Sequence, residues 1–262
     1  MKYYWFSVIV LIIVMRLLLC NLNEREYFLR LGGEISINKV NFIEKNDDLY
    51  NILLNSDDFF STFFDYDWKA RKVNNLEEYK LLIKRSCISF SEIEKEKVRT
   101  CCENADNFFL KINVNGFDNI KASNIEWKLG RVKGREYEYG LPHTRGNDVI
   151  ILGDENLKDD MKTLTRTLIH EKIHLYQKQN REEVEMYNEY NNIEKLKKRE
   201  YNDYVRANPD LDGWIYIDKV NNSVMKCVYN SPNPESIIDV KNMNQKEEHP
   251  FERQATVIGE MY

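Results

Sequence analysis

Residues 148–179 read DVIILGDENLKDDMKTLTRTLIHEKIHLYQKQ, and this stretch decides the fold that we expect. Its beginning, residues 148–152, is an apolar run with the length and β-branched composition of a buried strand. From about residue 157 to residue 179, apolar side chains such as Leu164, Leu168 and Leu175 fall on or near one side of a helix. The sequence therefore predicts a strand that leads into a long helix with one buried side.

Upstream of this strand, glycines divide the chain into short segments whose alternating residues indicate strands. Two such runs are residues 126–129 and 136–139. The glycines are Gly116, Gly130, Gly134, Gly140 and Gly146. A small sheet followed by helices predicts an α+β fold for a domain that we place at residues 111–262.

Downstream of the long helix, the charged residues 182–204 predict a second helix, and residues 207–243 are rich in turns. A final short helix is expected to begin at Pro250, because proline is favoured in the first helical turn. Ala255 and Gly259 share one face of this helix with a glutamate, Glu252. Small residues there permit a close approach to the long helix.

Residues 23–110 are predicted to form a mainly helical region. Ser91 followed three residues later by Glu94 is a capping-box pattern, which predicts a helix that starts here and continues through Cys101 and Cys102. Adjacent cysteines do not readily bond each other. Because 5 cysteines are also too few for a disulfide scaffold, we expect buried thiols.

The N-terminal residues 3–20 read YYWFSVIVLIIVMRLLLC. The run is just long enough for a helix that crosses a bilayer, provided that Arg16 is tolerated, and its aromatic start is typical of a membrane interface. We therefore predict that residues 1–22 are a membrane anchor of a single-pass protein. The alternatives are a signal peptide whose cleavage leaves a secreted chain and a buried core helix.

The charge of the chain argues against a nucleic-acid partner. There are 38 Lys and Arg against 43 Asp and Glu, which gives a formal net charge of -5. The basic residues are interspersed with acidic ones and form no stripe that would follow a phosphate backbone.

The long helix contains the pattern His-Glu-x-x-His. His170 and His174 are one helical turn apart, so both rings lie on one face about 5–6 Å from each other and can bind one metal ion. Zinc accepts ring nitrogens, and in catalytic sites it keeps a position open for water. Glu171 is rotated by about 100° from His170 and would lie beside the metal, where it can take a proton from that water. We expect one Zn²⁺ per chain, with Glu171 as the general base.

The third ligand does not follow at a short spacing, because Gln177 and Asn180 stand where an extended zinc motif would have glycine and histidine. A carboxylate from a later helix is the other solution. Glu252 is the first choice, since its helix has small residues on the same face. The remaining candidates, most of them in a charged stretch whose simpler interpretation is a solvated helix face, are Glu182, Glu183, Glu185, Glu189, Glu194 and Glu200.

A family resemblance extends this interpretation. The His-Glu-x-x-His helix, the preceding small sheet and the downstream glutamate resemble the gluzincin branch of the zincin metallopeptidases. The segments YGLPHTR (139–145), LIHEKIHLYQ (168–177), NPD (208–210) and EHPFE (248–252) are similar to uncharacterised metallopeptidases of large DNA viruses. The resemblance covers about residues 124–262. It implies a zincin-like catalytic domain, with His170, His174 and Glu252 as ligands, and Lys172 departs from the general pattern of the helix.

These observations together predict a zinc-dependent hydrolase that cleaves a protein or peptide substrate. His143 and Arg145 precede the strand that leads to the helix, where they could contact an oxyanion or a substrate carboxylate. Their simpler interpretation is a loop histidine and an arginine that binds a nearby carbonyl. Tyr216 and Tyr229 are further candidates for the oxyanion, with nothing to choose between them.

The alternative function is a membrane-tethered structural or interaction protein whose metal site is absent or structural. A structural zinc site is normally closed by four protein ligands. This alternative predicts a fourth ligand such as Cys227 or His249.

Overall fold

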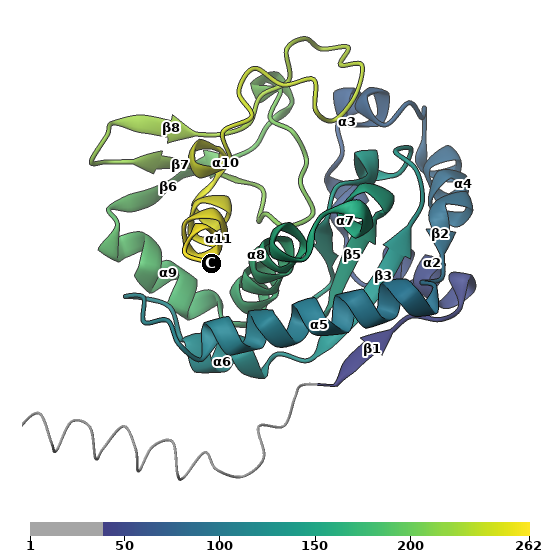
Figure 1. Ribbon diagram of the computed structural model, residues 1–262. Helices are drawn as coiled ribbons and strands as arrows, with labels where there is room; N and C mark the ends of the chain where they lie inside the picture. The colour runs from purple at the N-terminus through teal and green to yellow at the C-terminus, as the bar shows by residue number, and fades with distance from the viewer. Residues whose placement is uncertain (1–38) are drawn as a thin grey trace, which may run out of the picture. The chain divides into compact units, whose positions relative to one another are not determined.

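The structure is a computed structural model that describes residues 39–262, and two sheets lie among its helices (Figure 1). The helices are α2 (Asn46–Asn55), α3 (Asp65–Ala70), α4 (Leu76–Ser86), α5 (Glu92–Phe109), α6 (Asn119–Asn124), α7 (Asp154–Lys158), α8 (Met161–Gln179), α9 (Arg181–Tyr190), α10 (Gln245–Glu248) and α11 (Pro250–Glu260). The strands are β1 (Val40–Phe42), β2 (Cys87–Ile88), β3 (Trp127–Val132), β4 (His143–Arg145), β5 (Val149–Gly153), β6 (Ile193–Lys198), β7 (Trp214–Asp218) and β8 (Ser223–Met225).

The larger sheet has the strand order β1-β3-β5-β4, with β2 paired to the far end of β3. β1, β3 and β5 are parallel, whereas β2 and β4 are antiparallel to their neighbours. Together with the helices, this mixed sheet confirms the α+β class. Two of its strands, β1 and β2, come from the region predicted as mainly helical. They were missed because each is only two or three residues long.

Strand β5 is buried on both faces, as its apolar run predicted. Ile150 and Leu152 pack into a core with α5, α8 and α11, while Val149 and Ile151 face the opposite core with α2 and α4. Successive side chains of a strand point to opposite sides, so this one strand contributes to both layers. The sheet therefore holds α8 in a fixed position on one of its faces (Figure 1).

Several predicted elements are confirmed with sharper limits. Ser91 and Glu94 form the expected capping box of α5. The helix predicted from residue 157 to residue 179 is two helices, because Asp159 ends the first and the side chain of Asp160 accepts the N–H of Thr163 to cap α8. The last helix begins at Pro250, as expected.

Two predicted elements are wrong. Residues 136–139, read as a strand, belong in part to a short 3₁₀ turn in which Tyr139 has φ of 55°, a value unsuited to a strand. The helix predicted at residues 182–204 ends at Tyr190, and Asn192 then adopts a left-handed φ of 56°. The chain continues as β6, which pairs with β7 and β8 in a second sheet that the turn-rich composition concealed.

The predicted membrane localisation is corrected. No described helix is long and apolar enough to cross a bilayer, because even the longest ones, α5 and α8, carry charged side chains along their length. The segment that motivated the prediction, residues 1–22, lies outside the described residues.

Candidate metal centre

Helix α8 presents its His-Glu-x-x-His pattern in a largely buried setting. His174 and Glu171 are buried, and the ring of His170 is 15% exposed. The opposite sides of the helix carry Leu168 and Ile173, which belong to the main core. Burial of two imidazoles and a carboxylate is costly unless they have polar partners or an ion.

Three side chains converge on one point. His170 Nε2 and His174 Nε2 are 3.0 Å apart, and Glu252 Oε2 lies 3.2 Å from the first and 3.7 Å from the second. Bonds of about 2.0–2.1 Å in tetrahedral geometry place ligand atoms about 3.3–3.4 Å apart. The distances between the three atoms are therefore close to those between the ligand atoms of a tetrahedral zinc site. Within residues 39–262, this is the one cluster of at least three His, Cys, Asp or Glu side chains with such spacing.

Glu252 reaches this point because the start of α11 lies against α8. The side chain of His249 caps the helix by accepting the N–H of Phe251, and Ala255 and Ile258 anchor it in the core shared with α8. A first-turn carboxylate also suits the positive end of the helix dipole. Gly259 is not needed for the close approach, since a Cβ there would lie 3.7 Å from Arg166 Cγ, an ordinary contact.

The electrostatics of the cluster favour a cation. Burial lowers the pKa of His174, but Asp210, Glu252 and Glu171 outweigh it and raise that pKa to about 10. Burial raises the pKa of Glu252, yet His174 and His170 hold it well below its usual range. The carboxylates thus make a strongly negative pocket in which positive charge is stabilised. A divalent cation between the two rings would be stabilised by the same negative potential.

A cavity of about 400 Å³ opens over the cluster, and His170, Glu171 and Glu252 form part of its wall. Burial, followed by the charge of Asp210, raises the pKa of Glu171 well above its usual range. In the part of the chain that the structure describes, Glu171 Oε2 has no hydrogen-bond partner. Because Glu171 lines the cavity, its carboxyl group is a candidate for proton exchange with a molecule bound there.

Lys172, which departs from the zincin pattern, points away from the cluster. Its ammonium group lies 2.5 Å from Asp106 Oδ1, 3.1 Å from the carbonyl oxygen of Ser123 and 4.2 Å from the centre of the Trp127 ring. The lysine thus joins α8 to α5 and the sheet. It leaves the His170 face of the helix unchanged.

The two residues proposed as substrate contacts have different positions. His143 lines the cavity, but its Nδ1 lies 2.9 Å from the carbonyl oxygen of Leu141 and its Nε2 lies 3.3 Å from the hydroxyl of Tyr137. Arg145 is fully buried, and its guanidinium binds Asp57, Tyr137 and the carbonyl of Leu53. These contacts agree with its simpler interpretation, and Arg145 does not line the cavity.

The other candidates lie elsewhere. His249 Nε2 faces Asp212, and Cys227 Sγ faces the carbonyl of Asn242. The hydroxyls of Tyr216 and Tyr229 donate to Asp212 and Asp67. Neither His249 nor Cys227, nor any of the six alternative glutamates between residues 182 and 200, belongs to the cluster. Tyr216 and Tyr229 do not line the cavity over it.

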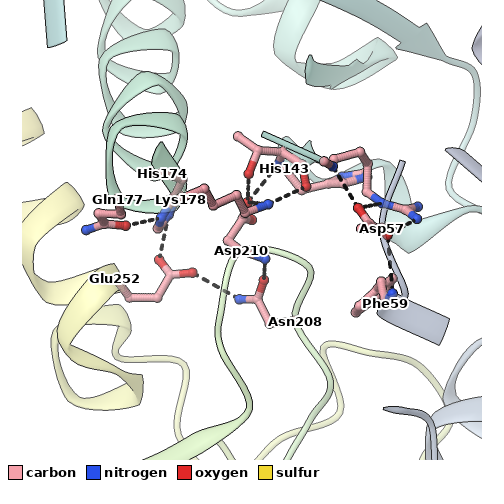
Figure 2. A network of polar contacts seen from close by, with 12 residues as sticks. Asp57, Phe59, His143, His174, Gln177, Lys178, Asn208, Asp210 and Glu252 are labelled. Atoms are coloured by element: carbon pink, nitrogen blue, oxygen red, sulfur yellow. Dashed lines mark hydrogen bonds and ion pairs between the residues drawn. The ribbon is translucent and has the colours of Figure 1, made fainter. Parts of the chain in front are cut away.

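Three residues that surround the cluster had no predicted role. Gln177 contacts His174, Asn208 contacts Glu252, and Asp210 links the loop of Asn208 to β4 and Lys178 (Figure 2). In the sequence, Asn208 and Asp210 stand out only through the family resemblance. Their signal was an Asn-Pro-Asp turn, which does not reveal what its side chains contact.

Comparisons of the chain with protein families, curated proteins and solved structures find no match. Any functional conclusion therefore rests on the geometry of the cluster.

Proposed function

We propose that this chain is a zinc-dependent metallopeptidase with a zincin-like catalytic domain. The observation that carries the proposal is the spacing of His170 Nε2, His174 Nε2 and Glu252 Oε2, which are 3.0–3.7 Å from one another. Three protein ligands with a cavity above them match a catalytic site with one open position. The substrate would be a protein or peptide whose backbone enters that cavity.

Each residue of the cluster has a distinct role in this proposal. His170, His174 and Glu252 hold the ion. Zinc supplies a Lewis acid that polarises a carbonyl and makes water acidic enough to be deprotonated near neutral pH. Glu171 takes the proton of the attacking water and returns it to the leaving amine.

The lack of a fourth ligand among residues 39–262 separates this proposal from a structural zinc site. Among the described residues, neither Cys227 nor His249 approaches the cluster. Two of the three ligands, His170 and Glu252, line a cavity large enough for a substrate group. A structural site would be sealed by protein.

The test is Glu171→Gln in the full chain, with zinc content and hydrolysis of denatured casein as the two measurements. We expect about one zinc per chain in both proteins and a loss of at least 100-fold in turnover in the variant, because a general base contributes about 10²–10⁴-fold. Glu182→Gln, an exposed carboxylate on α9, is the matched control and should match the wild type. Unchanged turnover in Glu171→Gln, or a wild type without zinc, would contradict the proposal.

A further inference from the structure

Gln177 holds the second histidine through the ring nitrogen that faces away from the cluster. Its Oε1 lies 2.8 Å from His174 Nδ1, while its Nε2 donates to the carbonyl of Phe251 at 3.0 Å and to Gln254 Oε1 at 2.8 Å. Because the backbone carbonyl of Phe251 can only accept, it requires the NH₂ group of Gln177, and the amide oxygen must face the histidine. His174 therefore carries a proton on Nδ1, and Nε2 is the ring nitrogen left to face a metal ion in the cluster.

Asn208 holds the carboxylate of Glu252 in a similar way, through the oxygen that faces away from the cluster. Its Nδ2 donates to Glu252 Oε1 at 3.0 Å, and its Oδ1 accepts the backbone N–H of Asp210 at 3.0 Å. The backbone N–H can only be a donor, so the amide must present its NH₂ group to Glu252. One oxygen of Glu252 is thereby occupied, and Oε2 is left for the cluster (Figure 2).

The loop that carries Asn208 is fixed on both sides. The N–H of Ala207 donates to Asp67 Oδ1 at 3.0 Å. Asp210 accepts the N–H of Thr144 at 2.8 Å and the hydroxyl of the same residue. Both carboxylates are buried, so the position of Asn208 is set by rigid anchors on α3 and β4.

From these contacts we infer that Gln177 and Asn208 are positioning residues for zinc: each amide occupies the outer atom of one ligand and thereby directs the inner atom of His174 or Glu252 to the metal. This inference rests on the proposed zinc site. It assigns a role to the Asn-Pro-Asp turn, which the proposed reaction does not otherwise use. Loss of such contacts to metal ligands typically weakens metal affinity by about 10–100-fold.

The experiment measures zinc affinity by competition with a chelator in four full-chain variants. Gln177→Leu and Asn208→Asp should bind zinc about 10–100-fold more weakly than the wild type, the second because a carboxylate replaces the donor that faces Glu252. Gln177→Glu loses the donor to α11 but keeps an acceptor for His174 Nδ1, so its zinc affinity should lie closer to that of the wild type than the affinity of Gln177→Leu does. Asn202→Asp, the same substitution at an exposed position, is the matched control.

A second measurement separates positioning from folding. The melting temperature of each metal-free variant reports whether the fold is intact, and the visible spectrum of the cobalt-loaded protein reports the ligand geometry. We expect altered cobalt spectra for Gln177→Leu and Asn208→Asp, with the Gln177→Glu spectrum close to that of the wild type. The inference would be overturned if the wild type bound zinc and both Gln177→Leu and Asn208→Asp bound it with the same affinity. That result would leave the proposed function intact. A wild type without zinc would overturn both.

Discussion

At the scale of single residues, the buried lysine beside the zinc motif is the clearest departure from pattern. Lys172 is fully buried, and Asp106 is the carboxylate that faces its ammonium group. Trp127 contacts both partners, since its ring lies under the ammonium group and its Nε1 donates to Asp106 at 3.0 Å. The pair stabilises the junction of α5, α8 and β3.

Removing the two partners should have unequal effects on stability. Asp106→Asn leaves a buried ammonium group without its carboxylate, so we expect a loss of about 3 kcal/mol in the free energy of unfolding. Lys172→Met keeps the volume and leaves the partly exposed Asp106 in contact with water, so its loss should be smaller. Urea unfolding measures both. Zinc affinity should be unchanged in Lys172→Met, and a tenfold loss there would show that the lysine acts on the metal site.

Only part of the site was predictable from residue types and spacing. A separation of four on a helix brings His170 and His174 together whatever the rest of the chain does. Glu252 was the preferred third ligand because its helix carries small residues, although Gly259 proves unnecessary for the approach. Gln177 and Asn208 could not be predicted, since an amide has no characteristic spacing and its contacts depend on tertiary structure.

At the scale of elements, the predictions succeeded where the signal is local. The apolar run of β5, the capping box of α5 and the proline that begins α11 lie within a few residues of the elements that they define. The prediction failed at β6, because residues 193–198 are mostly exposed and charged. They form a strand only through pairing with β7.

Two glycines at opposite ends of the β5–α8–α11 unit should respond in opposite ways to alanine. Gly153 ends β5, and a Cβ there would lie 2.1 Å from the carbonyl oxygen of Gly140. The backbone of one segment must therefore shift, and we expect Gly153→Ala to lose about 3 kcal/mol of unfolding free energy.

Gly259→Ala is the matched substitution. A Cβ there meets only an ordinary contact with Arg166, and alanine is favoured over glycine in a helix by about 1 kcal/mol. We expect this variant to be more stable than the wild type by up to about that amount in the same urea measurement. A destabilised Gly259→Ala would restore the idea that α11 needs glycine to approach α8.

At the scale of the whole molecule, one polar network joins the N-terminal third to the candidate site. Arg145 on β4 binds both carboxylate oxygens of Asp57, which follows α2. The neighbouring Thr144 holds Asp210, whose N–H binds the side chain of Asn208, the partner of Glu252 (Figure 2). Residues 88 positions apart form this link, so no local pattern in the sequence could have indicated it.

This link predicts how the stability of the protein depends on acid. Burial raises the pKa of Asp57, but Arg145 and the N–H groups of Gly146 and Phe59 outweigh it and lower the pKa to about 2. An unfolded aspartate has a pKa near 3.9. The ion pair therefore contributes its full stability above about pH 5, and that contribution is lost as the pH falls towards 2.

Asp57→Asn should isolate this contribution. At pH 6 the variant is expected to be clearly less stable than the wild type to urea, because Arg145 remains buried without its carboxylate. At pH 2.5 the difference should be much smaller, because this pH is close to the pKa of Asp57 in the folded wild type. The ionised carboxylate then contributes much less to the free energy of unfolding. Asp58→Asn, an exposed neighbour, should differ little from the wild type at either pH. If the deficit of Asp57→Asn were the same at both pH values, Asp57 would act through its shape and hydrogen bonds, and the charge link between the N-terminal third and β4 would be refuted.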